Sequence, residues 1–309
     1  MDRNQRDGLI FVLIAVSGYS FLPVFTNKLF DTGLEPLDIA FWRFLIAAPL
    51  FWLVALQRER PSPLRGANPL PWRKLLALGT LMGLAATSAF MGLQRIPAST
   101  FVVLFYTYPT MVALLSLFLG ERLRLQAWVA LGLTLIGIVL TAPDFSAGLS
   151  GDNLPGVLLA FLNAFVVAVY YILNARILRG HRAFIHATAL ILTGALILMS
   201  AVTVIRGGAA VPANLTAWLL LLGLALISTV MPVFSISHGL QRLGATRASI
   251  LGTVEPVLTS ALAVIFLGDR IQPIQLVGGA FILASILILQ ARRPSSRRDY
   301  QPETTVAGD

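Results

Sequence analysis

The 309-residue chain is 57% hydrophobic and only 12% charged, with a mean hydropathy of +0.81. A soluble domain carries about 25% charged residues, so the composition excludes an ordinary soluble protein and indicates a membrane protein. The absence of cysteine excludes disulfides, thiolate metal sites and a cysteine nucleophile. The net charge of +9 could suggest nucleic acid, but the placement of the basic residues favours membrane topology as its origin, and we expect no nucleic-acid partner.

Apolar segments of membrane-spanning length follow one another along the whole chain. A helix needs roughly 20 apolar residues to cross the bilayer core, with a range of about 17–25. The first run carries Tyr19, Phe21 and Pro23 and continues without a small-residue cleavage site, so it predicts a span rather than a cleaved signal. Ten segments qualify: 8–27, 37–56, 73–93, 98–119, 125–141, 155–175, 184–205, 215–238, 245–267 and 273–290.

The basic residues lie unevenly across these segments. Of the 23 Lys and Arg, 18 fall on the side of the N terminus and four on the opposite side, while Arg43 lies inside the second segment. Cytoplasmic loops of membrane proteins carry an excess of Lys and Arg. The sequence therefore predicts a multi-pass protein of the cell inner membrane, surrounded by the lipid bilayer, with both termini in the cytoplasm.

One passage is written twice. Residues 92–121 and 239–269 both open with Gly-Leu-Gln-Arg, share a proline (Pro109 and Pro256) and close on Leu-Gly, an acid and an arginine. Self-similarity at a long fixed offset, here 147 residues up to the proline, indicates duplicated halves.

Each half contains five predicted spans. Because five is odd, the second half must enter the membrane upside down relative to the first, which is the inverted-repeat architecture of many secondary transporters. The predicted fold is therefore all-α, with ten transmembrane helices. Its parts are a first repeat (1–142), an inter-repeat loop (143–154), a second repeat (155–291) and a disordered basic cytoplasmic tail (292–309).

The matched prolines indicate where a transport path would run. Paired Gly or Pro interruptions in the two halves of a transporter are the best sequence pointer to its binding site. Pro109 and Pro256 are therefore candidate hinges, although a purely structural kink is an equally open alternative. Glu121 and Asp269, which end the fourth and ninth segments, are candidate gate anchors at opposite membrane faces.

Two charges lie inside predicted spans. An ionised group at the bilayer centre costs about 2.5–3.5 kcal/mol on insertion scales, so each is a functional hypothesis. Glu255, at the repeat position of Tyr108, could carry a proton, orient a substrate ammonium or form a helix–helix hydrogen bond, and the last is slightly favoured. For Arg43 a structural role is favoured over a functional one.

Aromatic and polar side chains within the spans are the candidate substrate-binding residues. Phe101, Phe105 and Tyr108 share one helical face, from which Tyr106 points away. Polar side chains in hydrocarbon need partners or water, so they should face inward, where many will only bond neighbouring helices. The candidate set is Tyr19, Ser20, Thr87, Phe90, Phe101, Phe105, Tyr108, Asn163, Tyr170, Ser235, His238 and Glu255.

The chain resembles the EamA family of the drug/metabolite transporter superfamily, whose members are ten-helix carriers with two five-helix repeats. The resemblance rests on Pro23 and Lys28, Arg43-Phe44, the passage from Pro109 to Arg122, Glu255-Pro256 and Gly268-Asp269-Arg270, where the family more often has Glu than Asp269. It implies an inner-membrane carrier that commonly exports amino acids or other small metabolites. The aromatic-amino-acid exporters are the most similar branch.

The sequence thus predicts a secondary transporter that exports small neutral metabolites, in particular aromatic and other neutral amino acids, by alternating access. Alternatives are an exporter of other metabolites or drugs, a channel, and an intramembrane enzyme. The three histidines are scattered and no metal-ligand spacing or phosphate-binding loop occurs, so we expect no enzyme, no cofactor and no metal. Glycines such as Gly79 and Gly83 serve internal packing or a homodimer equally well.

Overall fold

The computed structural model describes residues 3–57, 70–121, 123–141, 153–181, 183–267 and 272–290, and these residues form helices and short connections without a strand. The predicted all-α class is confirmed. The helices are α1 (Arg3–Ser20), α2 (Leu22–Phe30), α3 (Pro36–Gln57), α4 (Trp72–Leu93), α5 (Ala98–Phe105), α6 (Tyr108–Phe118), α7 (Leu125–Thr141), α8 (Leu154–Ile177), α9 (Phe184–Ile205), α10 (Leu215–Ala225), the π-helix η3 (Leu226–Val230), α11 (Met231–Leu243), α12 (Ala245–Gly252), α13 (Glu255–Leu267) and α14 (Pro273–Gln290).

Eight helices or helix runs in the described part of the chain are long and apolar enough to cross a bilayer. They are Asn4–Phe30, Pro36–Gln57, Trp72–Leu93, Thr100–Phe118, Leu154–Ile177, Phe184–Ile205, Leu215–Leu243 and Ala245–Phe266, and they coincide with eight of the ten predicted segments. The other two segments form the shorter apolar helices Leu125–Thr141 and Pro273–Ile288. A helix satisfies its own backbone hydrogen bonds, which is what hydrocarbon requires of any chain that crosses it.

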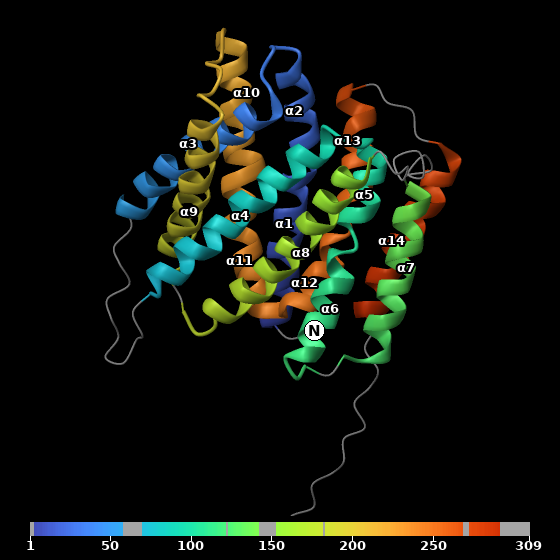
Figure 1. Ribbon diagram of the computed structural model, residues 1–309. Helices are drawn as coiled ribbons and strands as arrows, with labels where there is room; N and C mark the ends of the chain where they lie inside the picture. Colours follow the sequence, from blue (N-terminus) through green and yellow to red (C-terminus); the bar gives the residue numbers. More distant parts are fainter. Residues whose placement is uncertain are drawn as a thin grey trace, which may run out of the picture.

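The helices lie side by side in one bundle, with α7 and α14 paired at one edge and α3 near the other (Figure 1). Helices distant in sequence make the most extensive contacts. The pairs α4–α9, α7–α14 and α3–α9 each join one half of the chain to the other, as do α1–α11 and α4–α8. Neither half therefore forms a separate core.

Glycines make the closest of these contacts. A Cβ on Gly79 of α4 would collide with the backbone oxygen of Ile191 on α9, and a Cβ on Gly194 of α9 would meet the backbone of α4 in return. Gly137 of α7 and Gly278 of α14 face each other in the same way. These glycines therefore serve packing inside the monomer, and the homodimer stays a prediction.

Polar side chains add specific links between the halves. The hydroxyls of Thr134 on α7 and Ser285 on α14 lie 2.9 Å apart, and the indole nitrogen of Trp52 donates to the Thr193 hydroxyl at 2.9 Å. At the end of the bundle opposite the N terminus, Arg206 closes α9 by pairing with two acids near the start of α3, Glu35 at 2.6 Å and Asp38 at 3.3 Å.

Continuity differs between two of these helix pairs. The contacting helices α4 and α8 are each unbroken, whereas α1 and α11 each belong to an interrupted run. The first run breaks at Phe21, two residues before Pro23, and the other passes through the π-turn of η3 just before Pro232. The Thr229 hydroxyl donates to the Leu224 carbonyl at 3.1 Å within this turn. Proline and π-turns are the usual causes of such distortions.

We expect Gly79→Ala to lower the stability of the purified protein. The added methyl group must push α4 away from the backbone of α9, and overpacking of this kind costs about 1–3 kcal/mol. The measurement is thermal unfolding in detergent. Gly132→Ala is the matched control, because a Cβ at Gly132 meets no atom within 4 Å, and it should leave the melting temperature unchanged or raise it. Equal melting temperatures for the two variants would contradict the close α4–α9 contact.

Candidate functional site

Two helices are broken at matched places. The run that contains Pro109 ends its first helix, α5, at Phe105 and begins α6 at Tyr108. The run that contains Pro256 ends α12 at Gly252 and begins α13 at Glu255. Each break thus falls just before its proline, at the same offset as the sequence repeat.

The local chemistry of the two breaks is the same. A proline at the second position of a helix lacks an N–H, and its ring excludes the carbonyl four residues earlier, so the preceding helix must end. The chain turns instead by bonding three residues back, from the Thr107 amide to Leu104 and from the Thr253 amide to Ile250, both at 3.2 Å. The hydroxyls of Thr107 and Thr253 donate to the same two carbonyls at 2.6 Å.

The first break presents tyrosines to the interior of the bundle. Tyr106 and Tyr108 are almost fully buried, and their ring centroids lie 6.0 Å apart. Tyr108 also lies 5.2 Å from Phe105 and 5.5 Å from Tyr171 of α8, which lies 6.3 Å from its neighbour Tyr170. We call Tyr19, Tyr106, Tyr108, Tyr170 and Tyr171 the tyrosine cluster.

Tyr106 corrects the helical-face prediction. The spacing of an unbroken helix points Tyr106 away from Tyr108, but the helix ends between them, and the break turns Tyr106 inward. The Tyr108 hydroxyl in turn donates to the backbone carbonyl of Ser249 on α12 at 3.3 Å, which joins the two broken helices.

The second break adds the only acid of this region within the described chain. The Glu255 carboxyl interacts with the Tyr106 hydroxyl, and the Ser20 hydroxyl donates to the Glu255 backbone carbonyl at 3.4 Å. Tyr19 lies near Glu255, Tyr170 and Tyr171. Glu255 and Tyr19 are half-buried, so each keeps part of its surface accessible.

The structure thus brings together six of the predicted binding residues, namely Tyr19, Ser20, Phe105, Tyr108, Tyr170 and Glu255. Phe101 continues the aromatic row, stacking on Phe105 at 6.4 Å, but lies in a separate apolar cluster with Ile96 and Leu104. Phe90 is buried in the main core. Tyr106 and Tyr171 are members of the cluster that the sequence did not single out.

Two of the residues predicted to bind substrate make contacts between helices. The Asn163 amide of α8 donates to the Ala85 carbonyl and, at 3.2 Å, to the Ser88 hydroxyl, both on α4. The Thr87 hydroxyl bonds the Gly83 carbonyl of its own helix at 3.0 Å and contacts the Met199 sulfur at 3.4 Å. Both residues therefore stabilise helix contacts.

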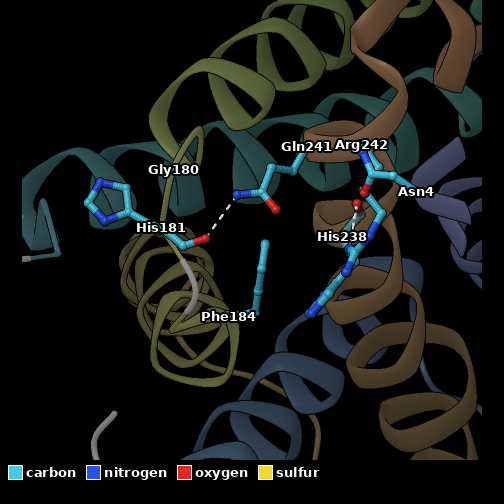
Figure 2. A pocket seen from close by; sticks show the side chains of 7 residues that line it. All are labelled: Asn4, Gly180, His181, Phe184, His238, Gln241 and Arg242. Carbon is cyan, nitrogen blue, oxygen red and sulfur yellow. Dashed lines mark hydrogen bonds between the residues drawn. The ribbon is translucent and has the colours of Figure 1, made fainter. Parts of the chain in front are cut away.

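His238 lies in a different place, at a pocket near the N-terminal end of the bundle (Figure 2). Its ring packs among Phe184, Phe11 and Phe234, with centroids 3.7, 4.7 and 4.3 Å away. Ser235 is buried one turn earlier on α11. The pocket has a volume of about 570 Å³ and is lined by Asn4, Gly180, His181, Phe184, His238, Gln241 and Arg242.

The predicted hinges are buried, whereas Glu121, one of the two predicted gate anchors, is exposed. Pro109 and Pro256 are both buried at the breaks. Glu121 is exposed after α6, where its amide bonds the Ser116 carbonyl at 2.9 Å and closes the helix end around Gly120, which adopts φ 84°. Asp269 lies outside the described residues, as do the tail 292–309 and nearly all of the inter-repeat loop. Among the described side chains, no group of three or more His, Asp or Glu is placed to hold a metal ion.

The sequence of the chain also matches a known protein family. The model of the EamA-like transporter family matches this chain twice, at residues 6–142 and again at 154–290. The chain belongs to the EamA-like transporter family. The membership confirms the resemblance drawn from the motifs.

Relatives of this EamA-like chain are also named as transporters. The uncharacterised transporter YcbK of Bacillus subtilis is 26% identical over 297 residues, covering 94% of this chain and 95% of its own. The threonine/homoserine exporter RhtA of Escherichia coli is 30% identical over 230 residues, covering 70% and 74%. A solved crystal structure shares the fold, with a TM-score of 0.76 at 21% identity over 92% of this chain and 96% of its own. The EamA-like chain is accordingly a transporter and not an enzyme.

We expect Asn163→Ala to weaken the transporter without changing its substrate affinity. The variant removes bonds between α8 and α4, which costs about 0.5–1.5 kcal/mol, and touches no residue of the tyrosine cluster. The measurements are the melting temperature and the KM of transport. Thr80→Ala is the control on α4, because the exposed Thr80 hydroxyl bonds only its own helix. A raised KM with an unchanged melting temperature would return Asn163 to the binding site.

Proposed function

We propose that this transporter exports small neutral metabolites, amino acids in particular, across the bacterial inner membrane by alternating access. The observation that carries the proposal is the meeting of the two broken helices, where Tyr108 and Glu255 occupy equivalent positions beside a tyrosine cluster. Broken helices that meet near the middle of the membrane, one from each half, are where transporters with inverted repeats bind substrate.

The ten-span inverted-repeat architecture is part of the proposal. Its support is that the contacts come in equivalent pairs. Under an offset of five spans, the α1–α11 contact corresponds to α8–α4, and both are among the most extensive in the bundle. The α3–α9 contact and the α7–α14 contact each join a span of the first half to the equivalent span of the second half. The proposed boundaries remain 1–142 and 155–291, joined by 143–154.

The proposed orientation places the N terminus and the tail 292–309 in the cytoplasm. Its support is the distribution of Lys and Arg, 18 of which lie on the N-terminal side. The pocket that Asn4 and His238 line would then open to the cytoplasm.

The substrate class follows from the side chains at the site. Tyrosine rings with a single carboxyl suit neutral or amphipathic solutes better than phosphorylated ones, which recruit several Lys or Arg. RhtA is named for threonine and homoserine. The aromatic rings of the cluster favour aromatic amino acids as well.

The matched breaks also support the roles proposed for the prolines. Each lies where a backbone ladder is already open, so a change of angle there requires the loss of fewer hydrogen bonds than elsewhere in the span. Pro109 and Pro256 are accordingly proposed hinges, and Glu121 and Asp269 proposed gate anchors at the helix ends.

We expect purified protein in liposomes to show counterflow with labelled Phe, Trp, Tyr, Thr or Met. Counterflow is saturable for a carrier that alternates between two faces, whereas a channel shows none. The panel therefore tests carrier and substrate together. Exchange only with other metabolites or drugs would replace the amino-acid assignment, and absence of counterflow with leakage of all solutes would favour a channel.

Glu255→Gln separates the three roles left open for this acid. A proton carrier loses the pH dependence of transport on conversion to Gln, and an ammonium partner raises the KM for amino acids. A purely structural hydrogen bond, which Gln can keep with Tyr106, leaves both nearly unchanged. We expect this last result, measured as transport in proteoliposomes at several pH values. Asp31→Asn, at an exposed acid after α2, is the control.

A further inference from the structure

Arg43 is a buried cation in the first half of α3. Its residue surface is only 7% exposed, and it lies within the candidate span Pro36–Gln57. Its neighbour Phe44 is fully buried, so this face of α3 points into the bundle and not toward lipid.

No acid pairs with Arg43 in the described chain. Asp38 and Glu35, the acids nearest on the same helix, are both taken by Arg206. Asp38 lies five residues before Arg43, a rotation that sets the two side chains about 140° apart on the helix. The Arg43 Nε is buried without a hydrogen-bond partner, and the guanidinium carbon lies 4.6 Å from the centroid of the Phe44 ring.

The guanidinium lies on the side of the tyrosine cluster. Arg43 lies near Tyr19, the same tyrosine that lies near Glu255, Tyr170 and Tyr171. A second unsatisfied group occurs on an element that packs against α3: the Ser228 hydroxyl of η3 is fully buried and has no partner. Both α3 and η3 thus carry a buried donor that no described side chain satisfies.

A guanidinium without a counter-charge is unfavourable inside a membrane protein. Removing one partner of a buried ion pair is strongly destabilising, so an arginine that is buried without an anion is stabilised when a ligand supplies one. The planar fork of arginine matches a carboxylate with two parallel hydrogen bonds. A carboxylate is also the group that all amino acids share.

We propose that Arg43 binds the carboxylate of the transported substrate. The inference rests on the proposed function, since it assigns a role within the same transport site. It restricts the substrates to solutes that carry a carboxylate, with the tyrosine cluster contacting the rest of the molecule.

The test compares an amino acid with its amide in counterflow. Wild type is expected to exchange phenylalanine, or whichever amino acid it transports, and to discriminate against the corresponding amide, which keeps the ammonium but lacks the carboxylate. Arg43→Gln should raise the KM of the amino acid by about 10- to 100-fold while the amide changes little. Arg43→Lys, which keeps the charge but not the fork, should restore part of the discrimination.

Stability gives a readout that a structural arginine would not share. Because Arg43→Gln removes an uncompensated charge, the melting temperature of the empty protein should stay unchanged or rise. Arg206→Gln is the matched control: it breaks two ion pairs and should lower the melting temperature while keeping the discrimination against the amide. Equal discrimination in Arg43→Gln and wild type, or a lowered melting temperature with unchanged discrimination, overturns the proposal.

Failure of the proposed function is distinguishable from failure of this inference. If wild type exchanges no amino acid, purified wild type and Arg43→Gln are heated with a panel of small carboxylates. An anion that stabilises wild type and not Arg43→Gln supports the anion site and leaves only the amino-acid assignment wrong. If no carboxylate stabilises wild type more than the variant, Arg43 binds no anion and the inference is wrong.

Discussion

The structure depends on one constraint: a chain inside hydrocarbon must satisfy its own backbone. Continuous helices meet that requirement everywhere except at the prolines, and Pro109 and Pro256 interrupt it at the same point of each half. The threonine in each break donates its hydroxyl to a freed carbonyl, so part of the missing backbone hydrogen bonding is replaced locally. Because the backbone at each break is hydrogen-bonded in this way, the side chains of the next residues, Tyr108 and Glu255, can face the interior of the bundle.

The two halves are held together by backbone contact and small polar bonds. Gly79 against Gly194 and Gly137 against Gly278 allow helices from different halves to touch, and the Thr134–Ser285 bond fixes one of these pairs. Between lipid-exposed helices there is little hydrophobic gain from association, so close packing of small residues contributes most of the attraction.

Much of the fold follows from sequence because its signals are local. Apolar run length located the helices, and the matched prolines located the breaks, since proline restricts the chain whatever its surroundings. Tyr108 and Glu255 emerged from alignment of the copies. Tyr106 did not, because helical spacing was extended across a break that reverses it. Asn163 and Thr87 carry the same polar signal as the residues around the breaks, and only the position of the adjacent helix shows that they contact it.

Arg43 shows a further limit of sequence. Its charge is visible in the chain, but its lack of a partner is a property of the assembled bundle, in which the nearest acids of α3 pair with Arg206 from another helix. The π-turn of η3 is likewise set by packing against α1 and α3 and has no clear sequence signal of its own beyond Pro232.

The α4–α8 pair and the α1–α11 pair differ in continuity, and they should therefore differ in stiffness. The unbroken pair α4–α8 transmits a displacement along its whole length, as two stiff rods do. The interrupted runs that contain α1 and α11 can bend at Phe21 and at η3 and absorb the same displacement within a few residues. The bundle thus has a stiffer side and a more flexible side. Under the proposed alternating access, the two open forms need not be mirror images, and bending between them would be concentrated in the interrupted runs.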